Sequence, residues 1–437
     1  MTTPRYPLRP APGGRHLVDG DGRPAWVQGD TAWSIIVSTL PEEWGRYLED
    51  RAARGFSAVI VNAIERLFTA DPPRTIDGLE PFTVPGDLGS PNEAYFARVD
   101  ALLAEAARHG IEVYLSPLYL GYIDPNFPGG FGFARRPEGW HDAVLAAGVE
   151  GTRAYGRFVG RRWRDVDNLT WVVGGDRDPA DVTEHMLAFV EGILEEDDRH
   201  LLTAHVHPDH AATEVYPDAS WLTLNQTYSY QIVHRKLAAD YERAPARPFV
   251  LFESTYEGEH DASELQIRRQ GWWALTAGAA GQFFGSFPVW LMSPGWQAAL
   301  DSPGARSMAH LREFVDAVPW WTLAPDADRA FLVAGLGGAH DLDRATAAVA
   351  LDGSAAIAYL PSPRTVTLDL ERLRGWVVRV RWFEAATGCW VDGSALTRRG
   401  FVQLVTPGPG DWGLIVDDPA AGAHGRWSAG SEAGLSS

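Results

Sequence analysis

Two acidic residues each follow an apolar run, in the contexts LTWVVGGD and PFVLFE, which end at Asp176 and Glu253. A carboxylate at the end of a buried strand is costly unless it has a partner or a chemical task. Two carboxyl groups on facing strands suit the cleavage of a glycosidic bond. One protonates the leaving oxygen, and the other attacks the anomeric carbon or activates water. We therefore expect Asp176 to be the acid/base and Glu253 to be the nucleophile.

Further polar and aromatic residues lie close to the ends of other apolar runs. Amides and phenols donate and accept hydrogen bonds without charge, which suits sugar hydroxyls, and indoles offer flat amphipathic surfaces. Asp30 is expected either to bind a sugar hydroxyl or to anchor the loop that follows it, and Trp33 to stack on a sugar. The other candidates for substrate binding are Asn62, Tyr119, Asn225, Gln226, Tyr228, Tyr256, Glu257 and Trp290.

His205 and His207 form an H-x-H pattern after the fifth apolar run. Such a pair can chelate a metal, but the sequence shows no clear third and fourth ligand. We expect both histidines to bind substrate by hydrogen bonds, with no metal and no cofactor. A metal-dependent hydrolase that uses the two histidines stays an alternative, as does a carbohydrate-binding barrel without catalysis.

Eight short apolar runs, separated by amphipathic helical stretches, must position these residues. Runs without strict alternation are typical of a parallel sheet covered on both faces. Eight of them predict a (β/α)8 barrel, in which catalytic groups lie at the carboxyl ends of the strands. A doubly wound sheet is the alternative, although no glycine-rich phosphate loop supports it. The expected strands are 25–30, 57–62, 111–116, 169–174, 201–206, 220–225, 248–253 and 280–285.

The pattern changes after Trp321. Between residues 331 and 416, short runs separated by Gly, Pro, Asp and Ser predict an antiparallel β-sandwich. We expect a barrel over 1–322, a linker near 322–329, a sandwich over 323–418 and a disordered tail over 419–437.

Composition restricts the partners. The chain has 437 residues and a net charge of 38 − 57 = −19, which argues against a nucleic-acid or anionic-membrane surface. The single cysteine, Cys389, leaves no intramolecular disulfide and no cysteine-based zinc site. No apolar run reaches the length of a membrane span or a signal peptide, so we expect a cytoplasmic protein with a carbohydrate substrate. The oligomeric state is left open.

Several segments together resemble the apiosidase-like glycoside hydrolase family: GDTAW, RGFSAVIVN, LTWVVGGDRDP, ESTYEG and RRQGWWALTAGAAGQFFGSFPVW. The resemblance covers about residues 15–325 and implies a (β/α)8 catalytic domain. The family's acid/base aspartate and nucleophilic glutamate fall on Asp176 and Glu253. The rest of the chain resembles a small β-domain that often follows this barrel and is named for collagen binding.

The resemblance also implies a reaction class. The characterised activity in the family is removal of β-linked apiose from plant pectin side chains. We therefore expect a retaining, exo-acting enzyme that removes a terminal apiose, or another furanose or pyranose. Gln282 departs from the family pattern, which often has histidine there, and the loop over residues 65–92 is particular to this chain.

Overall fold

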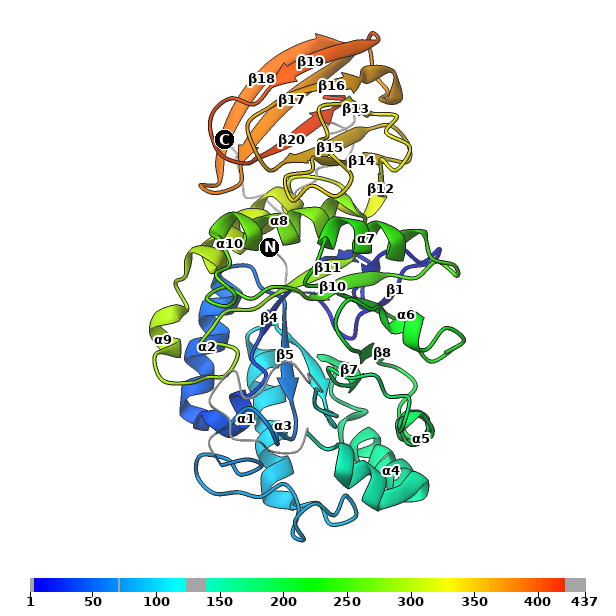
Figure 1. Ribbon diagram of the computed structural model, residues 1–437, viewed down its shortest axis with the longest axis vertical. Helices are drawn as coiled ribbons and strands as arrows, with labels where there is room; N and C mark the ends of the chain where they lie inside the picture. The colour runs from blue at the N-terminus through cyan, green and yellow to red at the C-terminus, as the bar shows by residue number, and fades with distance from the viewer. Residues whose placement is uncertain (1–3, 70, 123–138, 421–437) are drawn as a thin grey trace, which may run out of the picture.

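The computed structural model describes residues 4–69, 71–122 and 139–420. Most of the expected tail lies outside these ranges. Eight parallel strands form one sheet in the spatial order β8-β7-β6-β5-β4-β11-β10-β9, so the predicted (β/α)8 barrel is confirmed (Figure 1). The strands are β4 (Val27–Thr31), β5 (Ala58–Asn62), β6 (Glu112–Ser116), β7 (Leu169–Gly174), β8 (Leu201–His205), β9 (Asn225–Tyr228), β10 (Phe249–Glu253) and β11 (Gly281–Phe284).

Helices cover the outside of the barrel and begin where local signals place them. Pro41 starts one helix, and the side chains of Asn92 and Ser263 accept backbone hydrogen bonds at the starts of two others. None of the helices in the described ranges is long and apolar enough to span a bilayer. The helices are α1 (Ile35–Ser38), α2 (Pro41–Ala53), α3 (Glu93–Arg108), α4 (His141–Trp163), α5 (Thr183–Leu194), α6 (Ala212–Val215), α7 (Val233–Glu242), α8 (Glu264–Thr276), α9 (Trp296–Ala299) and α10 (Pro303–Asp316).

The barrel is nearly closed. Its sheet ends at β8 and β9, and within the described residues no ladder joins these two strands. They nevertheless approach each other, because the backbone N–H groups of Thr223 and Leu224 donate to the carbonyl of Leu202 at 3.0 and 3.3 Å. The joint between β8 and β9 is therefore held by individual contacts.

The prediction for the sixth strand, 220–225, was wrong in its position along the chain. The strand is β9, Asn225–Tyr228, and the apolar run before it is a turn that buries Leu222 and Leu224. The polar side chains of β9 are buried with partners: Asn225 accepts from the backbone N–H of Thr213, and Thr227 donates to Asp240. Hydrophobic patterning misses a strand whose buried side chains are polar.

The N-terminal segment closes the opposite end of the barrel from the site. It forms a small antiparallel sheet of β1 (Arg9–Pro10), β2 (Leu17–Val18) and β3 (Pro24–Ala25). Leu8 and Leu17 join the core inside the barrel. The hydroxyl of Tyr6 donates to the carbonyls of Ser57 and Gly110, which precede β5 and β6.

The C-terminal domain is a sandwich of two antiparallel sheets around one core, as predicted. One sheet has the order β12-β14-β15-β20-β17-β18 and the other β13-β16-β19. The first strand, β12 (Leu323–Pro325), lies within the expected linker and pairs with β14 (Thr346–Ala350). The others are β13 (Leu332–Ala334), β15 (Ala355–Leu360), β16 (Thr365–Asp369), β17 (Val377–Glu384), β18 (Cys389–Thr397), β19 (Phe401–Val405) and β20 (Trp412–Asp417).

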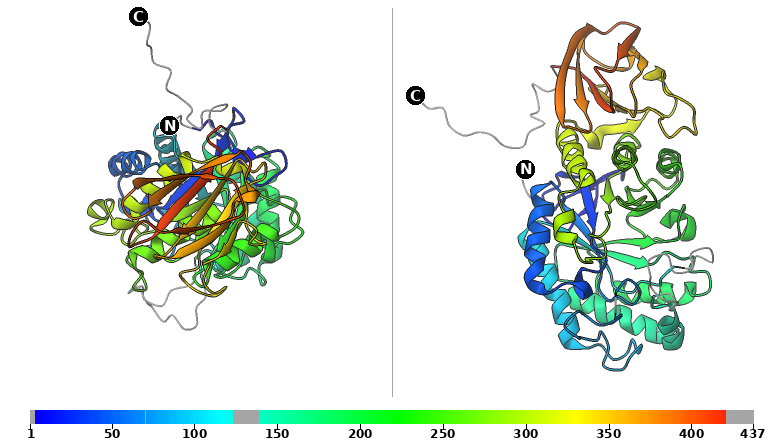
Figure 2. Two further views of the ribbon diagram at one scale, coloured as in Figure 1. Left: turned by 90° about the horizontal axis from the view of Figure 1, so that it is seen from above. Right: turned by 60° about the vertical axis from the view of Figure 1, so that its left-hand side comes forward.

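This domain packs on the outer helices of the barrel, over α8 and α10 (Figures 1 and 2). The indole of Trp272 stacks on Tyr359 with 5.1 Å between ring centroids. Beside it, Arg268 of α8 forms a buried ion pair with Asp411 at 2.8 Å, and Asp411 also accepts from the hydroxyl of Tyr359. The domain boundary therefore contains both an apolar core and a satisfied buried charge pair.

Candidate active site

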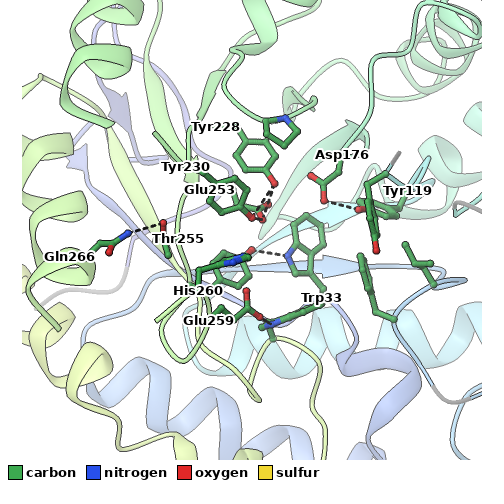
Figure 3. Close-up of a pocket in the computed structure, with 16 residues that line it drawn as sticks. Trp33, Tyr119, Asp176, Tyr228, Tyr230, Glu253, Thr255, Glu259, His260 and Gln266 are labelled. Atoms are coloured by element: carbon green, nitrogen blue, oxygen red, sulfur yellow. Dashed lines mark hydrogen bonds between the residues drawn. The ribbon is translucent and has the colours of Figure 1, made fainter. Parts of the chain in front are cut away.

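Asp176 and Glu253 meet at one imidazole at the carboxyl end of the barrel. The Nε2 atom of His205 lies 2.6 Å from Oδ1 of Asp176 and 3.3 Å from Oε2 of Glu253. One oxygen of each carboxylate and this nitrogen all lie within 4.8 Å of one another. Figure 3 shows the two carboxylates facing the same space above Trp33. The strands that carry Asp176 and Glu253 thus bring together two residues 77 positions apart in the chain.

Two glycines place Asp176 at this point. Gly174, at the end of β7, has φ of +98°, and a Cβ atom there would lie 2.3 Å from the carbonyl oxygen of His205. A Cβ on Gly175 would lie 2.8 Å from the backbone nitrogen of Leu120. Only glycine permits this backbone and these close approaches. The chain after β7 can therefore pass between the neighbouring strand ends and present the next residue, Asp176, to the cavity.

An irregularity in β10 points the side chain of Glu253 toward the cavity. Leu251 lies opposite Thr227 of β9, but Glu253 lies opposite the very next residue, Tyr228, so β10 carries an extra residue. Phe252 points into the barrel core, whereas Leu251 packs in the cluster that includes the helices. Regular alternation would send Glu253 outward with Leu251. The bulge turns Glu253 toward the cavity instead, a recurrent use of bulges beside active sites.

Three phenols hold the carboxylates. The hydroxyl of Tyr119 donates to Oδ2 of Asp176 at 2.8 Å. Oε1 of Glu253 accepts from the hydroxyls of Tyr230 at 3.0 Å and Tyr228 at 3.3 Å. Hydrogen bonds to a charged acceptor are stronger than neutral ones. They therefore fix the orientation of both carboxylates, and the bond from Tyr230 favours the ionised form of Glu253.

Burial governs the electrostatics of the site. Burial, together with the nearby Asp176 carboxylate, raises the pKa of Glu253 to about 8, although His205 and Tyr230 oppose the shift. Burial alone would lower the pKa of His205, but the Asp176 and Glu253 carboxylates outweigh it and the pKa is raised. Two carboxylates in one buried space disfavour double ionisation. The pKa values of His205 and Glu253 are thus both raised by neighbouring carboxylates.

A cavity of about 570 Å³ opens in front of the pair. Its aromatic wall includes Trp33, whose Nε1 donates to the hydroxyl of Tyr256 at 3.1 Å, and Trp290, whose Nε1 donates to Glu259 at 2.6 Å. Flat indoles beside carboxylates and phenols suit a sugar ring. The lining residues are Trp33, Leu67, Phe68, Tyr119, Tyr122, Asp176, Pro208, Tyr228, Tyr230, Glu253, Thr255, Tyr256, Glu259, His260, Gln266 and Trp290.

Two predicted substrate ligands are buried away from the cavity. Asp30 is fully buried against α2, where Oδ2 accepts from Tyr47 at 2.8 Å and pairs with Arg51 at 3.2 Å. Val27 of β4 faces the barrel core, so alternation sends Asp30 to the outer face. Asn62 donates to Glu65 at 2.7 Å and stabilises the loop after β5. Asp30 therefore anchors structure, the second of the two roles considered for it.

Three more predicted ligands have other partners. Asn225 holds the backbone of Thr213, as described above. Glu257 accepts from the backbone N–H of Gly304, in the first turn of α10, at 2.7 Å. The ring of His207 lies 3.7 Å from that of His210, outside the lining of the cavity. Strand ends and loops thus carry polar residues for structural reasons as well as for binding.

Gln226 and His205 lie behind the residues that line the cavity and contact each other there. The side-chain oxygen of Gln226 lies 3.3 Å from Nδ1 of His205, and both side chains are buried. A proton on Nδ1 then points to Gln226 and leaves Nε2 for the carboxylates. The sequence placed these residues near the site but gave no indication that His205 bridges Asp176 and Glu253.

Tyr230, Glu259 and His260 line the cavity, but the sequence analysis did not predict them as site residues. Tyr230 lies two residues after Tyr228 in the segment NQTYSY, and this Y-x-Y spacing is the signal that could have found it. Glu259 and His260 follow ESTYEG closely, yet they lie beyond the strand end on which the prediction relied. Loop residues escape a search restricted to strand ends.

The geometry also limits where a metal could bind. Asp176, His205 and Glu253 present a nitrogen and two oxygens within 4.8 Å of one another, a donor set that zinc accepts. However, Nε2 of His205 and Oδ1 of Asp176 lie 2.6 Å apart, within ion-pair distance of each other. His207, the second residue of the predicted H-x-H chelate, lies outside this group. The pair of histidines therefore does not form a joint site.

Comparison with known proteins assigns the family. Residues 11–322 match the family described as "Apiosidase-like, catalytic domain". The chain belongs to this family. Residues 329–417 match a domain described as "Putative collagen-binding domain of a collagenase". The protein is thus a glycoside hydrolase, and the predicted family resemblance is confirmed.

Two solved structures match nearly the whole length of this member of the family, and a third matches a shorter part of it. A glycoside hydrolase is 21% identical with a TM-score of 0.81, covering 95% of this chain and 97% of its own. A family 5 glycoside hydrolase from Bacteroides vulgatus is 21% identical with a TM-score of 0.82, covering 97% and 94%. A family 5 mannosidase from Rhizomucor miehei is 12% identical with a TM-score of 0.51, covering 70% and 97%. No match was found among curated proteins.

Proposed function

We propose that this protein is a retaining, exo-acting glycoside hydrolase in which Asp176 is the acid/base and Glu253 is the nucleophile. The observation that carries the proposal is the short separation of the two carboxylates, with facing oxygens within 4.8 Å. Retaining enzymes keep their carboxyl groups about 5–5.5 Å apart, whereas inverting enzymes need about 6.5–9.5 Å to admit a water molecule.

The two carboxylates suit different steps. In the first, an oxygen of Glu253 bonds to the anomeric carbon as the glycosidic C–O bond breaks, and Asp176 gives its proton to the leaving oxygen. In the second, Asp176 takes a proton from water, whose oxygen attacks the anomeric carbon and displaces Glu253. Asp176 is the more exposed, with 18% of its side chain accessible against 6% for Glu253. It can therefore exchange protons with water more readily.

The hydrogen bonds support the same assignment. Tyr228 and Tyr230 fix one oxygen of Glu253, and His205 lies beside the other. These donors favour a carboxylate that is ionised and held still for attack. The raised pKa of Glu253, taken alone, favours the reverse roles. The variants described in the Discussion distinguish the two assignments.

The substrate we propose is a glycoside with a terminal apiose or another furanose or pyranose. Support comes from the aromatic wall and from a cavity of about 570 Å³, within the size range of small-ligand sites. A panel of aryl glycosides that includes apiosides, arabinofuranosides and pyranosides tests the proposal. NMR of the first product should show retained anomeric configuration. Inverted product, or hydrolysis only within long chains, would contradict it.

A further inference from the structure

The incomplete joint of the barrel runs directly beside the proposed nucleophile. β8 ends at His205 and β9 ends at Tyr228, and among the described strands these two share no ladder. The hydroxyls of Tyr228 and Tyr230 both reach Glu253 from the β9 side. The loop after β8 meets β9 only at single points, the bridge between Ala211 and Thr227 and the hydrogen bond from the backbone N–H of Tyr228 to the carbonyl of His210 at 3.1 Å. Neither contact includes Tyr230, which lies beyond the end of β9.

Asp209, in the loop after β8, extends this connection past Tyr228 to the residues that follow β9. Its Oδ1 accepts from the hydroxyl of Ser229 at 2.9 Å and from the backbone N–H of Tyr230 at 3.2 Å. Its Oδ2 accepts from the side chain of Gln231 at 3.0 Å. One carboxylate thus binds three consecutive residues on the opposite side of the joint.

The backbone of Asp209 is in an uncommon conformation. Its φ is +63°, in the left-handed region that non-glycine residues seldom adopt. Such a conformation persists only where surrounding contacts fix it, and it is concentrated at functional sites. Here it directs the carboxylate across the joint to the Ser229–Gln231 segment.

The segment is also held from its other side. The backbone N–H of Ser229 donates to the carbonyl oxygen of Glu253 at 3.0 Å. Tyr230 therefore lies between β10 and Asp209, with its hydroxyl 3.0 Å from Oε1 of Glu253. Its place depends on both contacts, since β9 itself ends two residues earlier.

We propose that Asp209 is a positioning residue that sets the Tyr230 hydroxyl against Glu253 across the open joint of the barrel. The inference rests on the role of Glu253 in the proposed function. Loss of Asp209 frees the Tyr230 segment and weakens the hydrogen bond to Glu253. Glu253 then loses a donor that favours its ionised form, so ionisation requires a higher pH.

Kinetics of four variants test this inference. Asp209→Ala and Tyr230→Phe should each lower kcat about tenfold, a usual effect for losing a hydrogen bond to a charged group, with a smaller change in KM. Both should move the acidic limb of the kcat/KM profile to higher pH. The double variant should match Tyr230→Phe alone, because both changes remove the same contact. Asp209→Asn, which keeps an acceptor oxygen, should recover part of the rate.

A matched control variant and a measurement that needs no turnover test the role of Asp209 independently of the proposed function. Asp218→Ala removes an exposed carboxylate from the same β8–β9 connection and should leave kcat unchanged. NMR titration of the His205 imidazole in histidine-labelled protein detects the charge on Glu253 without turnover. It should show ionisation at higher pH in Asp209→Ala and in Tyr230→Phe.

The outcomes are distinct. The role of Asp209 would be overturned if His205 in Asp209→Ala titrated at the same pH as in the wild type. It would also be overturned if the kcat loss of the double variant equalled the losses of the two single variants combined. If the wild-type protein cleaves no glycoside on the panel, the proposed function fails. The His205 titration then decides the inference by itself, and an unshifted curve in Asp209→Ala overturns it.

Discussion

Asp176 and Glu253 each present one oxygen to the same nitrogen, Nε2 of His205, at 2.6 and 3.3 Å. This shared contact links the two carboxylates electrostatically, because a charge on either one stabilises an imidazolium between them. It also fixes their separation, on which the proposed stereochemistry depends. His205 is therefore expected to influence both steps of the reaction without itself bonding to the sugar.

Replacement of the two acids should have different effects. Asp176→Asn should lower kcat/KM about 10²–10⁴-fold on substrates with poor leaving groups and much less on activated aryl glycosides, which need no protonation. Glu253→Gln should abolish turnover of both kinds. Azide should rescue Asp176→Asn, giving a glycosyl azide of retained configuration. Azide rescue of Glu253→Gln with retained configuration would instead reverse the two roles.

The pH dependence should follow the ionisation of Glu253. Burial and the Asp176 carboxylate raise its pKa to about 8. Since the nucleophile must be ionised, kcat/KM should increase as pH rises from 6 toward about 8 and should fall as protons bind below that range. His205→Gln should move this limb to higher pH, because it removes the charge that favours ionised Glu253. A profile that is flat from pH 5 to 8 would contradict the assignment.

Trp290 should contribute binding rather than chemistry. It lines the cavity and is oriented by its hydrogen bond to Glu259. Trp290→Ala should raise KM roughly tenfold, the effect of about 1.4 kcal/mol, with a smaller change in kcat. Trp376→Ala, which removes an exposed indole of the C-terminal domain, is the control and should change neither constant. A loss confined to kcat would exclude a stacking role.

Glu112 should make stability depend on pH. It is buried in the barrel, and burial raises its pKa to about 8, while the hydroxyl of Thr170 opposes the shift. The ordinary value is about 4.3, so the folded state binds more protons between these values. This stabilisation is complete below the unfolded value and is lost as pH rises through about 8.

Glu112→Gln removes this titration. Its Tm should change less between pH 5 and 8.5 than that of the wild type, and should exceed the wild-type Tm at pH 8.5. Glu42→Gln, at an exposed position in the first turn of α2, provides the control and should follow the wild-type curve. Parallel curves for Glu112→Gln and the wild type would refute the buried, protonated state.

Chelation separates the proposed mechanism from a metal-dependent one. The proposed steps need only proton transfer by Asp176 and nucleophilic attack by Glu253, so dialysis against EDTA should leave kcat unchanged. His207→Ala should have little effect on kcat, since its ring lies with His210 away from the carboxylates. Loss of activity with EDTA and recovery with zinc would favour the metal-dependent alternative.

Much of this protein follows from local sequence. Apolar runs of strand length, each followed by an amphipathic helix, predict the barrel because a parallel sheet must be covered on both faces. The ends of the fourth and seventh runs then identify Asp176 and Glu253, since strand ends share one rim. Family motifs reinforce both conclusions.

Other features depend on contacts between distant parts of the chain. Asp30 follows an apolar strand as Glu253 does, yet it faces α2 and pairs with Arg51, because regular alternation in β4 sends it outward. Glu253 turns inward only because β10 carries a bulge relative to β9. Register and bulges depend on the partner strand and are invisible in a single segment.

The sequence alone therefore determined the barrel and the sandwich and placed Asp176 and Glu253 at strand ends, because each is encoded in short stretches whose burial pattern is local. Only the tertiary structure decided that His205 bridges those acids, that Tyr230 reaches Glu253 and that Asp209 crosses the β8–β9 joint. These contacts join residues from separate strands and loops. Their geometry is set by how the strands pack, which no local pattern specifies.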